Sequence, residues 1–315
     1  MATLPQAQKR LPNGQILTYG RLTWTNIEKP GPDDIAFLSD NYPFHPLDLE
    51  DCLSRIQRPK IDEYEDYLFL VLHFPVYNKT ARVTTPSQVA IFIGEDYLIT
   101  IHSGNLKTLV RFFKECNASE TTRQQNMGRS SGFLLYAVLD RLVDYCYPIL
   151  NKIGANVEDV EDRVFSQDSR RTVQELSVLR RDIIAYRRII RPQIGVIASL
   201  EQRERPFLKE DLEAYFGDIA DHIGEIWDAL EDYKEVIDGL NDTNNTLTSY
   251  RINDVMRVLT IISTIMLPLS VISGIYGMNV SLPLEGHPLA YAFVVLLMAV
   301  ITVSMLTVFR FKRWI

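Results

Sequence analysis

The sequence lacks several short motifs that mark common enzyme sites. It contains no phosphate-binding GxxxxGK loop, no Gly-rich dinucleotide turn and no HExxH helix. Each of these motifs places backbone amides, a base or metal ligands at a fixed spacing, so their absence removes the corresponding chemistry. We therefore expect a protein that is not an enzyme and that needs no organic cofactor.

Cysteine is scarce, and its pattern excludes two kinds of cross-link. The three cysteines are odd in number, far apart and outside any CxxC motif, and none has a histidine beside it (Cys52, Cys116 and Cys146). This spacing argues against a disulfide framework and against a zinc site. The five histidines are equally scattered and show no metal-binding spacing (His45, His73, His102, His222 and His287).

Charge is missing from two long stretches near the C-terminus. Residues 258–276 and 289–309 form runs of 19 and 21 residues without a charged side chain. At a rise of about 1.5 Å per residue, each run can cross the roughly 30 Å hydrocarbon core of a bilayer as a helix. Residues 277–279 follow the first run, and only the nine residues 280–288 lie between Asn279 and the second run. The sequence therefore predicts a hairpin of two membrane spans, 258–279 and 289–309, joined by an external loop.

Lysine and arginine are missing from that loop but flank the two spans. Arg251 and Arg257 precede the first span, and a basic tail, 310–315, follows the second. The N-terminus also lacks the apolar core of a secretory signal. Because basic residues favour the cytoplasmic side, we expect a multi-pass protein of the cell (inner) membrane with both termini in the cytoplasm.

The region before the spans divides into an α/β part and a helical part. Residues 1–130 have four segments with the aromatic and β-branched enrichment of strands, and two short segments that open with proline as helices do. The expected strands are 21–27, 67–74, 88–93 and 97–101, with a turn at Gly94-Glu95-Asp96, and the expected helices are 32–41 and 46–53. We predict a mixed sheet flanked by helices.

Long helices are expected from residue 131 onward. Residues 131–205 are predicted to form a helical hairpin, with a kink at Pro148, and 206–257 a stalk helix that continues into the first span. The stretch 207–266 contains no proline, so the stalk and span together predict a helix of about 70 residues. Two spans cannot enclose an aqueous path, so a transport function requires several chains around an axis.

Acidic residues concentrate in this stalk. Residues 201–242 contain 14 Asp and Glu against four Lys and Arg, a local balance of −10 in a chain of net charge −7. Several recur at helical spacing: Asp211, Asp218, Asp221, Glu225, Asp228, Asp232 and Glu235. Such a stripe is either a solvated helix face or a set of carboxylates that share divalent cations between subunits, because Mg²⁺ favours oxygen ligands.

A second set of residues falls near one face of the long helix. It is polar at its ends and apolar in the middle: Asp242, Asn253, Met256, Leu259, Leu267, Ser270 and Gly274. Ordinary packing between membrane helices explains small residues on such a face. A pore with a hydrophobic constriction, which closes by losing its water, explains the same pattern. The spacing alone leaves both interpretations open.

The first span ends in Tyr276-Gly277-Met278-Asn279. Gly277 permits tight backbone geometry, Met278 fills irregular space, and the Asn279 amide can face the water shell of a cation. On this motif the chain resembles the CorA family of magnesium channels, whose mark is Gly-Met-Asn at the end of the first of two C-terminal spans. Other matching segments are 45–51, 57–60, 64–67 and 253–262.

The resemblance implies an architecture and a function. It implies a funnel-shaped homopentamer with a cytosolic α/β/α domain, a long stalk helix that becomes the pore-lining span, and a basic cytosolic tail. The expected activity is transport of Mg²⁺, and of Co²⁺ or Ni²⁺, into the cytosol. The expected partners are copies of the chain, the lipid bilayer and divalent cations, with no nucleic acid.

The resemblance also implies roles for individual residues. Five copies of Asn279, with Gly277 and Met278, would form the selectivity ring. The pore would be lined by Asp242, Asn253, Met256, Leu259, Leu267 and Ser270, with Met256, Leu259 and Leu267 as its gate. A regulatory Mg²⁺ would lie between Asp218 of one subunit and Asp51 of the next, with Asp221 nearby.

The external loop departs from the family pattern. Many magnesium channels of the family follow the motif with Met-Pro-Glu-Leu, whereas this chain continues with 280–288, in which Glu285 is the one acidic residue. Two alternatives therefore remain. One is a zinc transporter of the same plan, similar to ZntB, and the other is a cytosolic scaffold that the hairpin anchors to the membrane.

Overall fold

The computed structural model describes residues 11–54, 57–164, 169–202, 210–278 and 289–314. Its contacts divide the chain into two units, Met1–Asn241 and Asp242–Ile315. The first unit carries the α/β fold and a helical bundle, and the second carries the apolar helices. Each unit is described by itself.

A six-stranded mixed sheet forms the centre of the first unit. Its strand order is β1-β2-β6-β5-β4-β3, with β2 parallel to β6 and every other neighbouring pair antiparallel. The mixed sheet expected from the sequence is thus confirmed. The strands are β1 (Gly14–Tyr19), β2 (Leu22–Glu28), β3 (Lys60–Glu63), β4 (Tyr67–Asn78), β5 (Val83–Gly94) and β6 (Tyr97–His102).

The four predicted strands correspond to β2, β4, β5 and β6. Strands β4 and β5 are longer than expected and form one hairpin of 12 residues each. The predicted turn does join β5 to β6, which pair in antiparallel fashion. Strand β3 was not predicted because it is a four-residue edge strand, rich in charge and only half-buried, so it lacks an apolar alternation.

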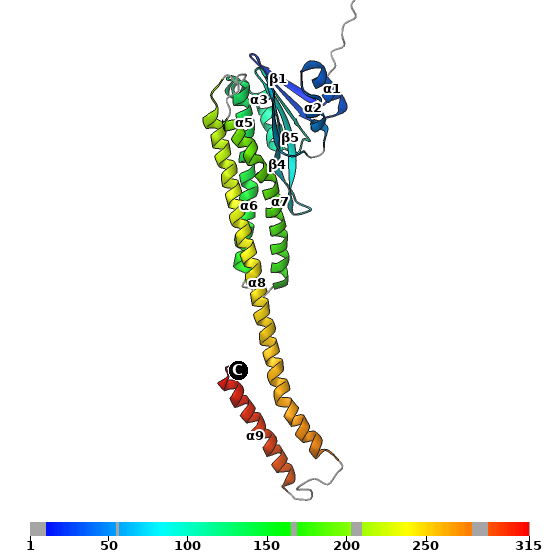
Figure 1. Cartoon of the computed structure of the whole chain (residues 1–315), viewed down its shortest axis with the longest axis vertical. Helices are drawn as coiled ribbons and strands as arrows, with labels where there is room; N and C mark the ends of the chain where they lie inside the picture. Colours follow the sequence, from blue (N-terminus) through cyan, green and yellow to red (C-terminus); the bar gives the residue numbers. More distant parts are fainter. Residues whose placement is uncertain (1–10, 55–56, 165–168, 203–209, 279–288, 315) are drawn as a thin grey trace, which may run out of the picture. The chain divides into compact units, whose positions relative to one another are not determined.

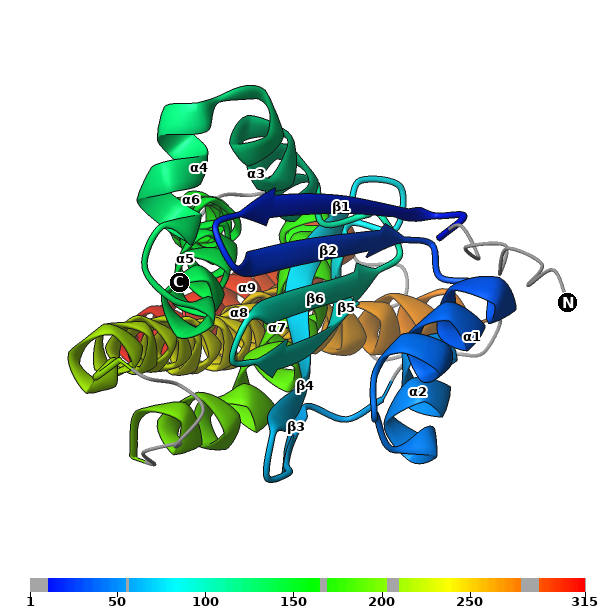
Figure 2. The ribbon, with the colours of Figure 1, turned by 90° about the horizontal axis from the view of Figure 1, so that it is seen from above.

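The helices of the first unit cover both faces of the sheet, and the expected α/β/α layering is confirmed. On one face, α1 and α2 pack Leu38 and Leu49 against Phe69 and Phe92 of the strands (Figure 2). On the other face, Trp24 meets two rings of α3 at 4.9 and 5.2 Å. The first helices are α1 (Pro32–Asn41), α2 (Pro46–Leu53), α3 (Lys107–Ala118) and α4 (Glu120–Met127).

Four longer helices follow, and in the first unit they run alongside one another (Figure 1). They are α5 (Ser131–Asp144), α6 (Cys146–Val164), α7 (Ser169–Gln202) and α8 (Glu213–Tyr276). The predicted first helix is divided at Tyr145, three residues before Pro148, because proline cannot donate a helical hydrogen bond. The long stalk helix is confirmed as α8, which has 64 residues.

Helix α8 begins later than the predicted stalk boundary at residue 206. Residues 203–209 lie outside the described part of the chain, and Glu210 is in a bend. The helix starts at Glu213, where the Asp211 carboxylate accepts a hydrogen bond of 3.1 Å from the Glu213 amide. A carboxylate in this place satisfies a free N–H group and complements the positive end of the helix dipole.

The second unit consists of the C-terminal part of α8 and of α9 (Ala290–Phe311). Both helices contain windows long and apolar enough to cross a membrane, and in each window only 6% of the residues are buried. Large side chains such as Leu267 and Leu296 are 68% and 63% exposed. An apolar surface this extensive must be covered by lipid or by other helices.

A buried polar chain lies between the sheet and α3. Trp24 Nε1 donates to Thr100 Oγ1 at 3.1 Å, and the Thr100 hydroxyl donates to Asn26 Oδ1 at 2.8 Å. His102 Nε2 lies 3.0 Å from the same oxygen, and the Gly104 amide donates to His102 Nδ1 at 3.0 Å. Since Nδ1 accepts, Nε2 must carry the proton, and the ring is neutral. Burial lowers the pKa of His102 to about 4.

This neutral ring predicts a loss of stability in acid. The pKa of His102 in the folded protein is below its usual value of 6.5. The stability that the neutral ring contributes is therefore complete above pH 6.5 and is lost as the pH falls toward 4. A shift of this size corresponds to about 3 kcal/mol. We expect the unfolding temperature of the detergent-solubilised protein to fall over this range, and to fall less in His102→Gln, which cannot take up a proton. Equal slopes for both proteins would contradict the assignment.

Candidate functional site

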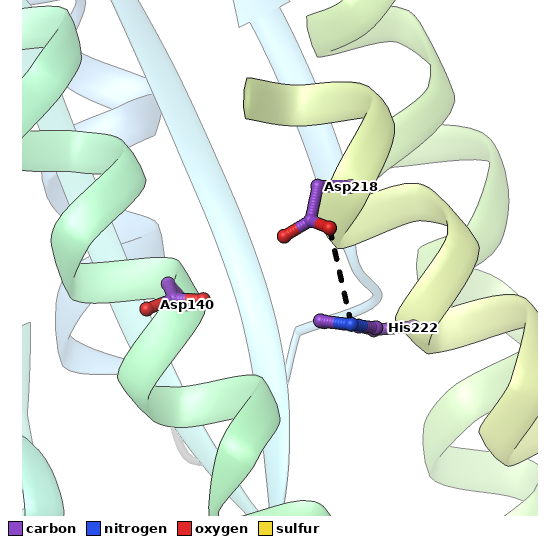
Figure 3. Close-up of side chains that lie close together, drawn as sticks. All are labelled: Asp140, Asp218 and His222. Carbon is purple, nitrogen blue, oxygen red and sulfur yellow. Dashed lines mark ion pairs between the residues drawn. The ribbon is translucent and has the colours of Figure 1, made fainter. Parts of the chain in front are cut away.

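Three side chains that can bind a metal converge between α5 and α8. Asp140 projects from α5, and Asp218 and His222 project from successive turns of α8 (Figure 3). One potential ligand atom from each lies within 4.8 Å of the other two. His222 Nε2 is 3.9 Å from Asp218 Oδ1, as the i,i+4 spacing on a helix allows. We call these three residues the α5–α8 cluster.

The electrostatics of the α5–α8 cluster suit a divalent cation. Burial raises the pKa of Asp140, and the nearby carboxylates of Asp144 and Asp218 raise it further, against smaller opposing effects of His222 and Arg141. Ionised Asp140 is therefore poorly compensated by the chain itself. Two carboxylates and an imidazole are donors that Mg²⁺, Co²⁺, Ni²⁺ and Zn²⁺ accept to different degrees, so the residues fit such an ion.

Helix α6 supports the cluster from one side. The Tyr147 hydroxyl donates to Glu225 Oε2 at 2.9 Å, and its ring meets the His222 imidazole edge to face at 5.9 Å. Burial raises the pKa of the Tyr147 hydroxyl, and the bond to Glu225 raises it further, so it stays protonated and keeps donating. These contacts restrict the imidazole to one side of α8.

The acidic residues of α8 separate into two groups. One group faces α7: Arg187 pairs with Glu231, and Arg180 Nε lies 3.0 Å from Asp238 Oδ1. The guanidinium of Arg187 also lies over the Trp227 ring at 5.0 Å. The other group is exposed and, among the described residues, has no cation partner on the chain: Asp221, Asp228, Asp232 and Glu235.

The predicted regulatory residues occupy three different settings. Asp218 belongs to the α5–α8 cluster, whereas Asp221 is exposed on the next turn and is not part of it. Asp51, at the end of α2, pairs with Lys60, whose Nζ is 2.7 Å from Asp51 Oδ2. The expected pairing of Asp218 with Asp51 joins two subunits, so it stays a prediction.

The sequence analysis missed two members of the cluster. His222 could have been found, because it lies four residues after Asp218 on a predicted helix and so shares its face. Asp140 gave no such signal, since only the packing of α5 on α8 brings it near Asp218. The cation site that the acidic stripe suggested therefore also includes the imidazole of His222 and the half-buried carboxylate of Asp140.

The predicted pore residues lie along the part of α8 in the second unit. Because the helix is continuous from Glu213 to Tyr276, their spacing places them along one side of it. Met256, Leu259 and Leu267 are 55%, 53% and 68% exposed. Asp242, Asn253 and Ser270 are exposed as well, so the single chain leaves this whole face open.

The Gly-Met-Asn motif begins where α8 ends. The Gly277 amide donates to the Ser273 carbonyl at 2.9 Å, and the Met278 amide donates to Ile275 at 3.2 Å. A β-carbon on Gly277 would lie 3.0 Å from the Ser273 oxygen, so a side chain would crowd this turn. The predicted selectivity residue Asn279 and the loop residue Glu285 lie outside the described residues.

A serine motif lies at the junction of α4 and α5. Residues 128–132 match the pattern GxSxG, which in serine hydrolases holds the nucleophile between a strand and a helix. Here Ser130 instead follows helix α4 and caps α5, accepting a hydrogen bond of 3.1 Å from the Phe133 amide. Its hydroxyl donates to Glu210 Oε2. Ser130 therefore serves as a helix cap.

Comparison with known proteins agrees with the architecture. The family model described as CorA-like Mg²⁺ transporter protein matches residues 19–313. The chain is 32% identical to the cobalt/magnesium transport protein CorA of Thermotoga maritima, covering 93% of this chain and 83% of that protein. It is also 20% identical to the zinc transport protein ZntB of Yersinia enterocolitica, covering 95% and 90%.

A solved structure matches the fold over nearly its full length. The complete structure of the CorA magnesium transporter from Methanocaldococcus jannaschii superposes with a TM-score of 0.82 at 26% identity. The match covers 95% of this chain and 94% of that chain. The mixed sheet, the long helix and the second apolar helix are therefore features shared with a magnesium transporter.

The α5–α8 cluster predicts opposite effects of Asp140→Asn with and without divalent ions. In EDTA, the substitution removes a poorly compensated charge and should raise the unfolding temperature by about 2 °C. This shift corresponds to an increase of up to about 1 kcal/mol in the free energy of unfolding. In millimolar Mg²⁺ the same change should reduce the stabilisation that the ion gives, because a ligand is lost. Thermal unfolding in both buffers measures this, with the exposed Glu158→Gln as control. An undiminished response to Mg²⁺ in Asp140→Asn would argue against the cluster.

Proposed function

The chain belongs to the CorA family of CorA-like Mg²⁺ transporter proteins, and on that basis we propose that it is a channel that moves Mg²⁺ into the cytosol. The observation that carries this proposal is the continuity of α8. One helix bears Asp218 and His222 of the α5–α8 cluster near its start and ends at the Gly-Met-Asn motif. A cation at the cluster can therefore act on the pore through a single element.

The path itself requires several copies of the chain. The exposed apolar face of α8 would turn toward an axis shared by five subunits, and α9 would lie outside it. Met256, Leu259 and Leu267 would then form an apolar constriction that closes by losing its water. Asn253 and Ser270 would offer polar groups on either side of it. Both termini would then lie in the cytoplasm, with the basic tail at the inner surface.

The selectivity ring would be formed by Asn279. Amide groups from five subunits can hydrogen-bond to the water shell of a cation without stripping it, and Mg²⁺ gives up its water reluctantly. The turn at Gly277 and Met278 would direct this residue to the mouth of the pore. Co²⁺ and Ni²⁺ carry similar water shells, and we include them among the transported ions.

Regulation would act at the stalk. Asp218 and Asp140, with His222, would hold a cytosolic Mg²⁺, and a neighbour's Asp51 would complete the oxygen ligands. The exposed carboxylates Asp221 and Asp228 would repel their counterparts on adjacent subunits unless cations lie between them. High cytosolic Mg²⁺ would thus favour the closed assembly, and its removal would let the subunits move apart.

Zinc transport is a second candidate. The nitrogen ligand of His222 suits Zn²⁺ better than Mg²⁺, and the chain is similar to a zinc transport protein as well as to CorA proteins. Competition among Mg²⁺, Co²⁺ and Zn²⁺ for uptake into proteoliposomes separates the two. Mg²⁺ uptake that micromolar Zn²⁺ leaves unaffected supports the first candidate.

Asn279→Ala should abolish selective Mg²⁺ uptake. The substitution removes the amide that would contact the hydrated ion and leaves the apolar gate in place. Uptake is measured with a Mg²⁺-sensitive dye in proteoliposomes, and Asn151→Ala, an exposed asparagine on α6, is the matched control. Selective uptake equal to that of the wild type would exclude the selectivity ring.

Asp218→Lys should weaken closure at high cytosolic Mg²⁺. It removes an oxygen ligand and adds a cation, so at least tenfold more Mg²⁺ should be needed to halve the flux, a change of about 1.4 kcal/mol. Flux is recorded while Mg²⁺ is varied on the stalk side. Glu158→Lys makes the same charge change at an exposed site on α6. Normal closure in Asp218→Lys would place regulation elsewhere.

A further inference from the structure

A lysine lies between two carboxylates at the junction of α2 and β3. Lys60 Nζ is 2.7 Å from Asp51 Oδ2 and 2.5 Å from Asp62 Oδ2. The side chains of Lys60, Asp51 and Asp62 are 34%, 19% and 37% exposed, so water reaches the group but does not surround it. The ammonium is thus shared by two acids in a place open to the solvent.

The ammonium of Lys60 also contacts an aromatic ring, and its backbone is fixed in the sheet. Its ammonium lies 5.2 Å from the centre of the Phe69 ring, on the neighbouring strand β4. Strand β3 pairs with β4 in antiparallel fashion, with Lys60 opposite Val71. The lysine can therefore move between its two acids while its backbone stays in the sheet.

The surroundings of Lys60 are more acidic than one ammonium can balance. Asp48, on the same helix as Asp51, is 2% exposed and accepts a hydrogen bond of 3.2 Å from the Tyr67 hydroxyl. Burial raises the pKa of Asp48 and the Asp62 carboxylate raises it further, whereas hydrogen bonds with Tyr64 and Tyr67 and the charge of Lys60 lower it. Three carboxylates thus lie near the Lys60 ammonium, so further positive charge is favoured there.

We propose that Lys60 is a displaceable internal counter-ion that sets the Mg²⁺ concentration at which Asp51 becomes a ligand. This inference rests on the proposed role of Asp51 in the regulatory site between subunits. In the absence of Mg²⁺ the ammonium occupies the carboxylate that the ion needs. When Asp51 turns to Mg²⁺, the ammonium keeps its contact with Asp62, so no buried charge is left without a partner.

The energetics give the direction of the effect. The positive charge of Lys60 repels a Mg²⁺ ion bound nearby, so removing this charge should strengthen Mg²⁺ binding. Its removal also frees the Asp51 carboxylate to act as a ligand. Partial exposure and salt reduce both contributions. We therefore expect a change of about threefold to tenfold in the half-effective Mg²⁺ concentration, toward tighter binding when the ammonium is absent.

The test compares Lys60→Met with Lys60→Arg in the full-length protein. Methionine keeps a long apolar side chain but has no charge, whereas arginine keeps the charge. Two quantities are measured: the Mg²⁺ concentration that halves flux in proteoliposomes, and the concentration that gives half of the Mg²⁺-dependent rise in unfolding temperature. Lys79→Met, in the exposed turn between β4 and β5, is the control for the loss of a lysine.

Both concentrations should fall about threefold to tenfold in Lys60→Met and stay near wild type in Lys60→Arg and Lys79→Met. An unchanged or higher value in Lys60→Met would overturn the proposal, because a lysine that merely holds α2 on β3 would, when removed, weaken the site. If Lys60→Met does not fold, Asp62→Asn provides the second test. It removes the alternative partner and should raise both concentrations, and an unchanged value would overturn the proposal.

Failure of the regulatory site itself gives a different result. Asp51→Ala in the wild-type background should raise the half-effective Mg²⁺ concentration, and in Lys60→Met it should cancel the gain. If Asp51→Ala has no effect in either background, the proposed role of Asp51 is wrong. If it has the expected effect but Lys60→Met does not, the inference about Lys60 alone is wrong.

Discussion

The structure depends on one helix that must satisfy two different solvents. Helix α8 runs unbroken from Glu213 to Tyr276, acidic along its first part and free of charge along its last 19 residues. Its polar part packs against α5, α6 and α7, whereas its apolar part has only 6% of its residues buried within the chain. A helix with this division must have one end in water and the other in lipid, because neither solvent accepts both.

Charge on the acidic part of α8 is managed in two ways. Toward α7, arginines pair with Glu231 and Asp238, so these acids bind the helix to its own bundle. Away from α7, Asp221 and Asp228 stay exposed, with no cation partner in the part of the chain that the structure describes. The outer acids add nothing to the packing of one subunit, and like charges between subunits repel. The assembly that we propose on this face would therefore depend on cations from solution and would respond to their concentration.

The α/β unit supplies the fixed frame for this response. The central strands of its sheet are buried on both faces, and even the polar chain from Trp24 to His102 is hydrogen-bonded. The charged groups of the proposed ion sites lie at the edges of this unit. Asp51 and Lys60 form an ion pair near the end of α2, and Asp140 of α5 lies close to Asp218 and His222 of α8. In the proposed assembly, rigid packing beside partly exposed, competing charges would let a small change in ion occupancy alter contacts between subunits without unfolding either one.

Four features could be predicted from the amino-acid sequence: the two spans, the long acidic helix, the mixed sheet and the Gly-Met-Asn motif. These features follow from local properties, since hydropathy, helical rise and strand alternation act over neighbouring residues. Three pairings became visible only in the folded chain: Asp140 joins Asp218 and His222, Asp51 pairs with Lys60, and part of the acidic stripe pairs with arginines of α7. These pairings join residues far apart in the chain, and their partners are chosen by how helices and strands pack, which no local pattern encodes.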